Sequence, residues 1–258
     1  SEMCIRDRGS AALYFVGSFD GKKFVNESPT QTKWLDWGKD NYATVTWSNA
    51  PAGRCIALGW MSNWQYANNV PTTQYRSTNT IARDLTLYRV GNELYLKSKP
   101  SPEIEKARVE KVDKSSFKVA GKYEIESLLR DNDGAYEIEM TIENAGASKM
   151  AFCLMNAKGE KVSMYYDVLR KQFAMDRSQS GAVDFSRDFP ALTVAPVDNA
   201  EKIHLRLFVD RCSVEAFGEN GRYAMTNLVF PSDTYNKMTF ESDKKSFIVK
   251  SLKIYRLK

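Results

Sequence analysis

The chain has 258 residues, of which 43% are hydrophobic and 27% charged, proportions that are ordinary for a folded globular protein of one large or two medium domains. Its net charge of +5 comes from Lys and Arg residues scattered along the chain, which argues against a nucleic-acid-binding stripe. The single histidine, His204, nearly excludes a His-dependent triad or a His-rich metal site. We therefore expect no metal, no cofactor and no nucleic-acid partner.

The first ten residues, SEMCIRDRGS, have no apolar run of the kind that a signal peptide carries. We expect residues 1–10 to be a non-native or unmatched segment. No run of about 18 apolar residues occurs elsewhere, so no membrane partner is expected either. The localisation and the oligomeric state cannot be determined from these features.

Short strands separated by turns are predicted for the rest of the chain. Period-two alternation places Tyr136 and Ile142 on one face of a half-buried strand, and Ile203 and Val209 on one face of another. Turn dipeptides lie between such segments: Asp20-Gly21, Asp133-Gly134, Lys158-Gly159 and Asn220-Gly221. Frequent turns between short strands predict an all-β sandwich, barrel or propeller.

The composition changes near residue 100, which predicts two domains. Residues 11–99 contain all five tryptophans, and residues 113–258 contain none while carrying about ten strand-like segments. Between them, residues 100–112 include Pro100, Pro102 and a charged stretch, which indicates a linker. The second domain is long enough to bury its own core.

Several motifs in the first domain resemble those of one enzyme family. They are Asp40-Asn41-Tyr42-Ala43, Gly53-Arg54, Gly59-Trp60-Met61 and Ser62-Asn63-Trp64-Gln65-Tyr66. In the second domain, the stretch from Leu205 to Phe217 and the block from Asp176 to Phe185 agree as well. In this order they resemble glycoside hydrolase family 32, the fructan hydrolases and invertases, over residues 11–258.

The resemblance implies a fold and a function. The fold would be all-β, with part of a five-bladed β-propeller (the end of the fourth blade and the fifth blade) in residues 11–99 and a β-sandwich in residues 113–258. The chain would be the C-terminal portion of a retaining β-fructosidase that acts on levan, inulin or sucrose-type bonds with water as acceptor. The family also implies a fructan or sucrose-type carbohydrate partner and a secreted or periplasmic bacterial enzyme.

The family's catalytic motifs do not occur in this sequence. Retaining hydrolysis needs two carboxyl groups about 5–5.5 Å apart. The family carries a nucleophilic Asp in Trp-Met-Asn-Asp-Pro-Asn-Gly, a stabilising Asp in Arg-Asp-Pro and an acid/base Glu in Glu-Cys. All three would lie upstream of residue 11, so no catalytic residue is carried over and the chain alone is expected to be inactive.

Four residues remain as candidate substrate contacts. By resemblance, Trp64 and Trp60 stack on a fructosyl ring, and Tyr42 and Asp40 bind sugar hydroxyls from the innermost strand of the last blade. Each has a structural alternative. Trp60 shares a strand face with Ile56 and Leu58, which favours the core. Asp40 could instead begin a strand, and Tyr42 could be packed.

The acid pair Asp210 and Glu215 invites a catalytic interpretation, but a turn between two strands explains it more simply, with Asp210 accepting turn amides. Two other functions stay open: a non-catalytic carbohydrate-binding or structural β protein, and a transferase of the same family, which differs only in its acceptor.

Overall fold

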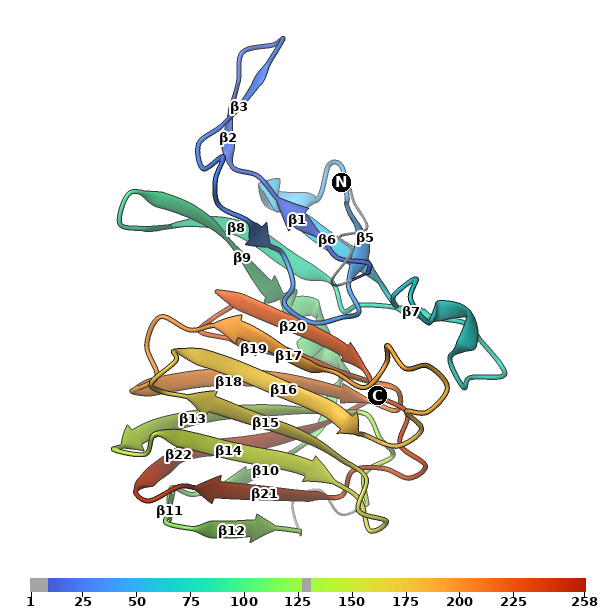
Figure 1. The fold of residues 1–258 in the computed structure, drawn as a ribbon, viewed down its shortest axis with the longest axis vertical. Coiled ribbons are helices and arrows are strands. Elements are labelled where there is room, and N and C mark those ends of the chain that lie inside the picture. Colours follow the sequence, from blue (N-terminus) through green and yellow to red (C-terminus); the bar gives the residue numbers. More distant parts are fainter. Residues whose placement is uncertain (1–8, 127–130) are drawn as a thin grey trace.

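The computed structural model describes residues 9–126 and 131–258. The described chain forms a smaller part, residues 9–100, that lies on one end of a larger two-sheet part (Figure 1). Within the described ranges, helical turns are limited to three short 3-10 segments: η1 (Pro51–Gly53), η2 (Ala67–Asn69) and η3 (Pro102–Ala107). The all-β expectation is confirmed.

The smaller part is built on an antiparallel sheet with the order β5-β6-β8-β9. Its strands are β5 (Tyr42–Thr46), β6 (Ile56–Met61), β8 (Arg83–Val90) and β9 (Glu93–Pro100), and β7 (Thr78–Asn79) pairs with the end of β6. Two further pairs join β1 (Leu13–Tyr14) to β4 (Lys33–Trp34) and β2 (Gly17–Phe19) to β3 (Phe24–Asn26). The β2–β3 hairpin, which turns at the predicted Asp20-Gly21, projects away from the rest (Figure 1).

The larger part is a sandwich of two antiparallel sheets. One sheet has the order β10-β22-β13-β18-β19-β20, with β11 also on β22: β10 (Arg108–Lys114), β11 (Phe117–Val119), β13 (Tyr136–Ala145), β18 (Lys202–Asp210), β19 (Ser213–Gly218), β20 (Tyr223–Leu228) and β22 (Ser246–Leu257). The other has the order β12-β21-β14-β15-β16-β17: β12 (Lys122–Ile125), β14 (Lys149–Met155), β15 (Lys161–Asp167), β16 (Gln172–Gln179), β17 (Leu192–Pro196) and β21 (Lys237–Ser242).

The core lies between these two sheets. Both strands that alternation predicted are present, as β13 and β18, and they are neighbours, with Ile138 opposite Leu207. These two side chains are buried and pack in one cluster with Phe152 and Met164 of the other sheet. Inward-facing residues of both sheets therefore make the core, as expected of aligned sandwich sheets.

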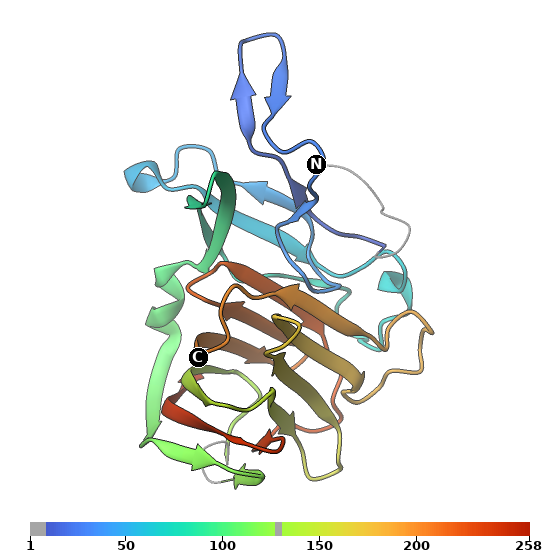
Figure 2. The same ribbon diagram turned by 60° about the vertical axis from the view of Figure 1, so that its left-hand side comes forward.

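Residues 100–112 contain the end of β9, the segment η3 and the first residues of β10. The chain passes along one edge of the molecule here, from the smaller part into the sandwich (Figure 2). Arg108, at the start of β10, makes a bidentate contact with the buried carboxylate of Glu137, with Nε and Nη2 each 2.8 Å from one of its oxygens.

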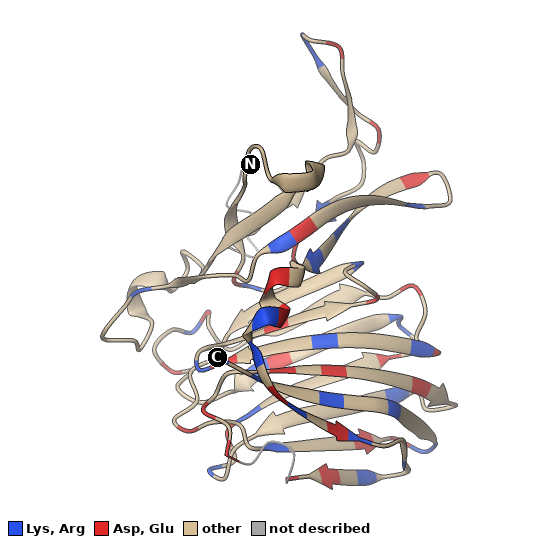
Figure 3. Ribbon diagram, turned by 180° about the vertical axis from the view of Figure 1, so that it is seen from behind, with Lys and Arg blue, Asp and Glu red and all other residues tan. Residues whose placement is uncertain are grey.

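The charged residues are mixed on the face opposite to that of Figure 1. There, Lys and Arg residues are interspersed with Asp and Glu (Figure 3).

The edge strand β20 of the sandwich is covered by the smaller part. Residues 37–40 run beside it: the amide of Trp37 donates to the carbonyl of Ala224 at 2.8 Å, and the amide of Asp40 donates to that of Thr226 at 3.1 Å. A Cβ on Gly38 would lie 2.0 Å from the Thr226 carbonyl oxygen, so only glycine permits this approach. An otherwise open strand edge is thereby paired.

Candidate carbohydrate-binding site and the interface beneath it

Three aromatic side chains form a cluster on the smaller part. The rings of Trp60, on β6, and Trp64, just beyond it, are 4.9 Å apart between centroids. Tyr42, on β5, meets the Trp60 ring edge-on at 6.3 Å. Trp64 is 59% exposed, so its ring offers an apolar face to solvent. The structure thus brings together three of the four predicted contact residues.

The burial pattern along β6 does not place Trp60 in the core, as its structural alternative would require. Met61 and Ala57 are buried, whereas Ile56, Leu58 and Trp60 are only partly buried. The buried face packs towards the sandwich, where Met61 lies in a cluster with Phe189. Trp60 therefore belongs to the half-exposed face, and its indole Nε1 donates to the Ser77 hydroxyl at 2.6 Å.

The backbone that carries Trp64 is held by a buried amide side chain. Asn63 is fully buried; its Oδ1 accepts from the amide of Gln65 at 3.0 Å, and its Nδ2 donates to the carbonyl of Lys39 at 2.9 Å. The amide of Trp64 itself donates to the Ser10 hydroxyl at 2.9 Å. These bonds fix the backbone beneath an exposed ring, which lowers the entropic cost of binding a ligand there.

Asp40 lies apart from the aromatic cluster, in the interface between the two parts. It is fully buried, and its carboxylate accepts from Nη1 of Arg177 on β16 and, at 2.6 Å, from the hydroxyl of Tyr66. The amide of Leu228 donates to the same carboxylate at 2.8 Å. Since no surface of Asp40 is open to solvent, its role in this structure is to join the parts, which is a structural role but not the strand start that the sequence suggested.

A second buried ion-pair network crosses the same interface. Nη1 of Arg83 donates to Asp36 at 2.7 Å, and Nη2 donates to Glu215 of the sandwich at 2.7 Å. The Thr226 amide donates to Asp36 at 2.8 Å. All three charged side chains are at most 3% exposed. Pairing of this kind compensates for the removal of the charges from water.

The two carboxylates around Arg83 are perturbed in opposite directions. Burial alone would raise the pKa of Asp36, but the charge of Arg83 and its hydrogen bonds, with those from Thr226 and Gly38, hold it below its ordinary value. For Glu215, burial outweighs the attraction of Arg83 and raises the pKa of the carboxyl. Asp36 is therefore the stronger anionic partner of this guanidinium.

The acid pair in the sandwich is explained structurally. Asp210 is exposed at the end of β18, where the turn to β19 begins, and its Oδ1 accepts from the amide of Arg211 at 2.7 Å. Glu215 is buried against Arg83, so it shares no site with Asp210. The sequence did not reveal the interface roles of Arg83 and Arg177. No local sequence pattern distinguishes a strand arginine that is buried from one that is exposed. Of the two, Arg177 lies in the block from Asp176 to Phe185 that resembles the family.

Within residues 9–126 and 131–258, no group of three or more His, Cys, Asp or Glu side chains is placed to hold a metal ion. In the same described ranges, no helix has the length and apolar character needed to cross a membrane.

Comparison with known proteins assigns the family. The chain matches "Glycosyl hydrolases family 32 N-terminal domain" over residues 1–100 and "Glycosyl hydrolases family 32 C terminal" over residues 103–256. The expected restriction to a C-terminal portion was therefore only partly right, because residues 1–100 match the family's N-terminal domain.

Individual relatives agree. The levanase of Bacillus subtilis (strain 168) is 35% identical over 260 residues, which cover 97% of this chain and 38% of the relative. The extracellular exo-inulinase inuE of Aspergillus niger is 31% identical over 236 residues, covering 87% of this chain and 44% of the relative. The chain thus spans less than half the length of these relatives.

Solved structures share the fold. The exo-inulinase from Aspergillus awamori matches with a TM-score of 0.84 at 26% identity, over 97% of this chain and 52% of that one. The fructofuranosidase from Schwanniomyces occidentalis complexed with fructose matches with a TM-score of 0.80 at 26% identity, over 95% of this chain and 53% of that one. Because a family model covers more than half of it, the chain belongs to glycosyl hydrolase family 32.

Proposed function

We propose that this chain is part of a secreted enzyme that hydrolyses β-fructosides of the levan, inulin or sucrose type, with retention of configuration and with water as the acceptor. The observation that carries the proposal is the exposed aromatic cluster of Trp60, Trp64 and Tyr42, in a chain of family 32. The names of the relatives, levanase and exo-inulinase, support the substrate class. On this proposal the sheet β5-β6-β8-β9 is the last blade of a five-bladed propeller.

The aromatic cluster would bind the sugar by stacking. A fructosyl ring presents C–H groups that pack on the face of an indole, and Trp64 has such a face in solvent. The phenol of Tyr42 would add a hydrogen-bonding group beside Trp60. Asp40 is not part of this proposed contact set, because its carboxylate is buried against Arg177.

The catalytic pair is proposed to come from elsewhere in a longer protein. A retaining mechanism needs a carboxylate nucleophile and a carboxylic acid about 5–5.5 Å apart. Asp40, which is two residues before Tyr42 of the aromatic cluster, already forms an ion pair with Arg177. The chain would then supply sugar contacts and the sandwich, while the chemistry takes place on residues outside it.

The site assignment is tested by Trp64→Ala in that longer enzyme. We expect kcat/KM on levan or inulin to fall more than tenfold, because lost stacking costs the transition state about 1.4 kcal/mol or more. The control is Trp47→Ala, since Trp47 is 51% exposed but lies outside the cluster, and we expect it to leave kcat/KM within twofold. An unchanged kcat/KM for Trp64→Ala would refute the site.

A second function, carbohydrate binding without hydrolysis, is favoured by the exposure of Trp64 alone. The two functions differ in what precedes this chain in its gene. Hydrolysis requires the three carboxylate motifs upstream, and a sequence that continues upstream without them would support the binding protein instead.

A further inference from the structure

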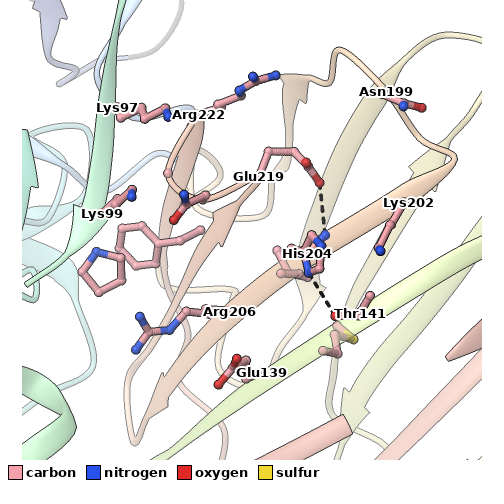
Figure 4. Close-up of a pocket in the computed structure, with 16 residues that line it drawn as sticks. Lys97, Lys99, Glu139, Thr141, Asn199, Lys202, His204, Arg206, Glu219 and Arg222 are labelled. Carbon is pink, nitrogen blue, oxygen red and sulfur yellow. Dashed lines mark hydrogen bonds between the residues drawn. The ribbon is translucent and has the colours of Figure 1, made fainter. Parts of the chain in front are cut away.

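A hollow lies between the two parts of the chain, away from the aromatic cluster. It has a volume of about 640 Å³ and is lined by residues of β9, β13, β18 and β19 and by the turn at residues 219–222. It shares no residue with the Trp60–Trp64 cluster. Figure 4 shows that one wall comes from the smaller part, through Lys97 and Lys99, and the other from the sandwich, through His204 and Lys202.

The lining is predominantly basic. It includes five cationic side chains and two carboxylates: Lys97, Lys99, Lys202, Arg206, Arg222, Glu139 and Glu219. The two arginines are already paired, Arg206 with Glu137 at 2.7 Å and Arg222 with Asp198 at 3.1 Å. In the described chain, no ion pair engages the three lysines. The Lys97 ammonium lies 5.3 Å from the centroid of the Tyr88 ring, so the charges of Lys99 and Lys202 are the ones fully available to a ligand that enters the hollow.

The two lysines of β9 line the same wall of the hollow because of their spacing on the strand. Lys97 and Lys99 are two residues apart on a strand, so their side chains project from the same face. Between them, the amide of Ser98 donates to the carbonyl of Gly221 at 2.8 Å and docks β9 onto the turn of the sandwich. A Cβ on Gly221 would lie 2.7 Å from the Ser98 carbonyl oxygen, so this docking depends on glycine.

The opposite wall includes the turn between β19 and β20. Glu219 and Asn220 both have left-handed φ angles, 49° and 59°, and the amide of Gly221 donates to the carbonyl of Gly218 at 2.9 Å, as in a type I′ turn. The Glu219 carboxylate accepts from the amide of His204 at 3.1 Å, and the His204 ring lies 3.0 Å from the Thr141 hydroxyl (Figure 4). The first contact holds the backbone of His204, and the second orients its imidazole before any ligand arrives.

We propose that this groove binds a small polyvalent oxyanion of the phosphate-ester or pyrophosphate class, held by Lys99 and Lys202 with the charge of Lys97 beside them. Lysine ammonium groups bind phosphate as point charges, and three of them exceed the two carboxylates present. A neutral sugar fits less well, because Phe217, the aromatic residue of the lining, is 3% exposed and offers no stacking face. This site is independent of the proposed fructoside site.

The test uses the one histidine of the chain as a reporter. His204 is the one histidine in the sequence and lines the groove, so its two ring C–H signals are the only histidine signals in a proton NMR spectrum of the purified chain. Titration with inorganic pyrophosphate at constant pH should shift these signals along a saturating curve. Sodium chloride at matched ionic strength should not. A shift that is absent, or that chloride reproduces, contradicts the proposal.

Variants then locate the ligand. The double variant Lys99→Gln, Lys202→Gln should bind pyrophosphate at least tenfold more weakly by calorimetry, with an unchanged melting temperature in the absence of anion. The matched control is Lys118→Gln on β11, an exposed lysine outside the groove, which should bind like the parent. Equal binding by the double variant and the parent would overturn the assignment to these lysines, as would a comparable loss in Lys118→Gln.

Discussion

Arg83 is the residue on which most of the interface chemistry converges. It is fully buried, and it joins Asp36 of its own part to Glu215 of the sandwich. Replacing it with Met removes the cation but leaves two carboxylates buried without their partner. We expect Arg83→Met to lower the free energy of unfolding by about 3–5 kcal/mol in urea titrations.

The control for this change is Arg170→Met, at an exposed ion pair with Asp167. Exposed pairs contribute little, so its urea midpoint should stay near that of the parent. If Arg83→Met also leaves the midpoint unchanged, the buried network does not stabilise the fold.

Asp36 should make stability depend on pH on the acid side. Its folded pKa lies below its ordinary value of 3.8, so its contribution is present above 3.8 and is lost as the pH falls through the folded value. We therefore expect Asp36→Asn to lose less stability than the parent on acidification below 3.8, measured by urea unfolding across that range.

The neighbouring Glu215 provides the contrast. Its folded pKa is raised by burial above its ordinary value of 4.5, so the stability linked to its protonated form is present below 4.5 and is lost as the pH rises through the folded pKa. Glu215→Gln should accordingly keep the acid-side loss of the parent. If the loss of stability below pH 3.8 disappears in Glu215→Gln but persists in Asp36→Asn, Glu215 is the titrating carboxylate and the prediction for Asp36 is wrong.

At the scale of elements, the covered edge of β20 shows how the two parts depend on each other. Gly38 allows residues 37–40 to pair with this edge, because a side chain there would meet the Thr226 backbone at 2.0 Å. We expect Gly38→Ala to lower the melting temperature, since the segment must move off the strand. Gly91→Ala is the control: Gly91 has a positive φ of 58° but open space around it, so only backbone strain is added. A smaller effect at Gly38 than at Gly91 would contradict the pairing.

The strands show which structural features hydrophobic alternation in the sequence can predict. Alternation located β13 and β18 because one of their faces meets the sandwich core and the other meets water. The same reasoning gave the wrong alternative for β6, where the bulky residues Ile56, Leu58 and Trp60 lie on the more exposed face. Alternation shows that two faces differ, but the sandwich docked behind β6, which no local pattern encodes, decides which face is buried.

The residues of the candidate site also fall into two groups, those that the motifs located correctly and one that they did not. Trp64 and Tyr42 could be named from motifs, and they do lie with Trp60. Asp40 carried the same motif evidence, but its partner Arg177 is 137 residues away in the chain. Pairings at such separations follow from the docking of the two parts and could not be read from either segment alone.

At the scale of the whole molecule, the smaller part should open before the sandwich. Its outer hairpin β2–β3 exposes Phe19, Phe24 and Val25, whereas the sandwich has a continuous buried core. Local stability follows the density of buried contacts, so limited proteolysis should cut within residues 1–100 first. Mass spectrometry of the early fragments would identify the sites. First cuts within the strands of the sandwich would contradict this order.

On the proposed function, this chain contributes sugar contacts but not the catalytic pair. The most direct measurement is fructose release by the purified chain from levan, inulin and sucrose over one day. We predict no release above a blank, since aromatic contacts cannot replace a nucleophile and a general acid, the latter worth about 10²–10⁴ in rate by itself. Fructose release that copurifies with the chain through successive purification steps would show that the chain carries its own catalytic carboxylates.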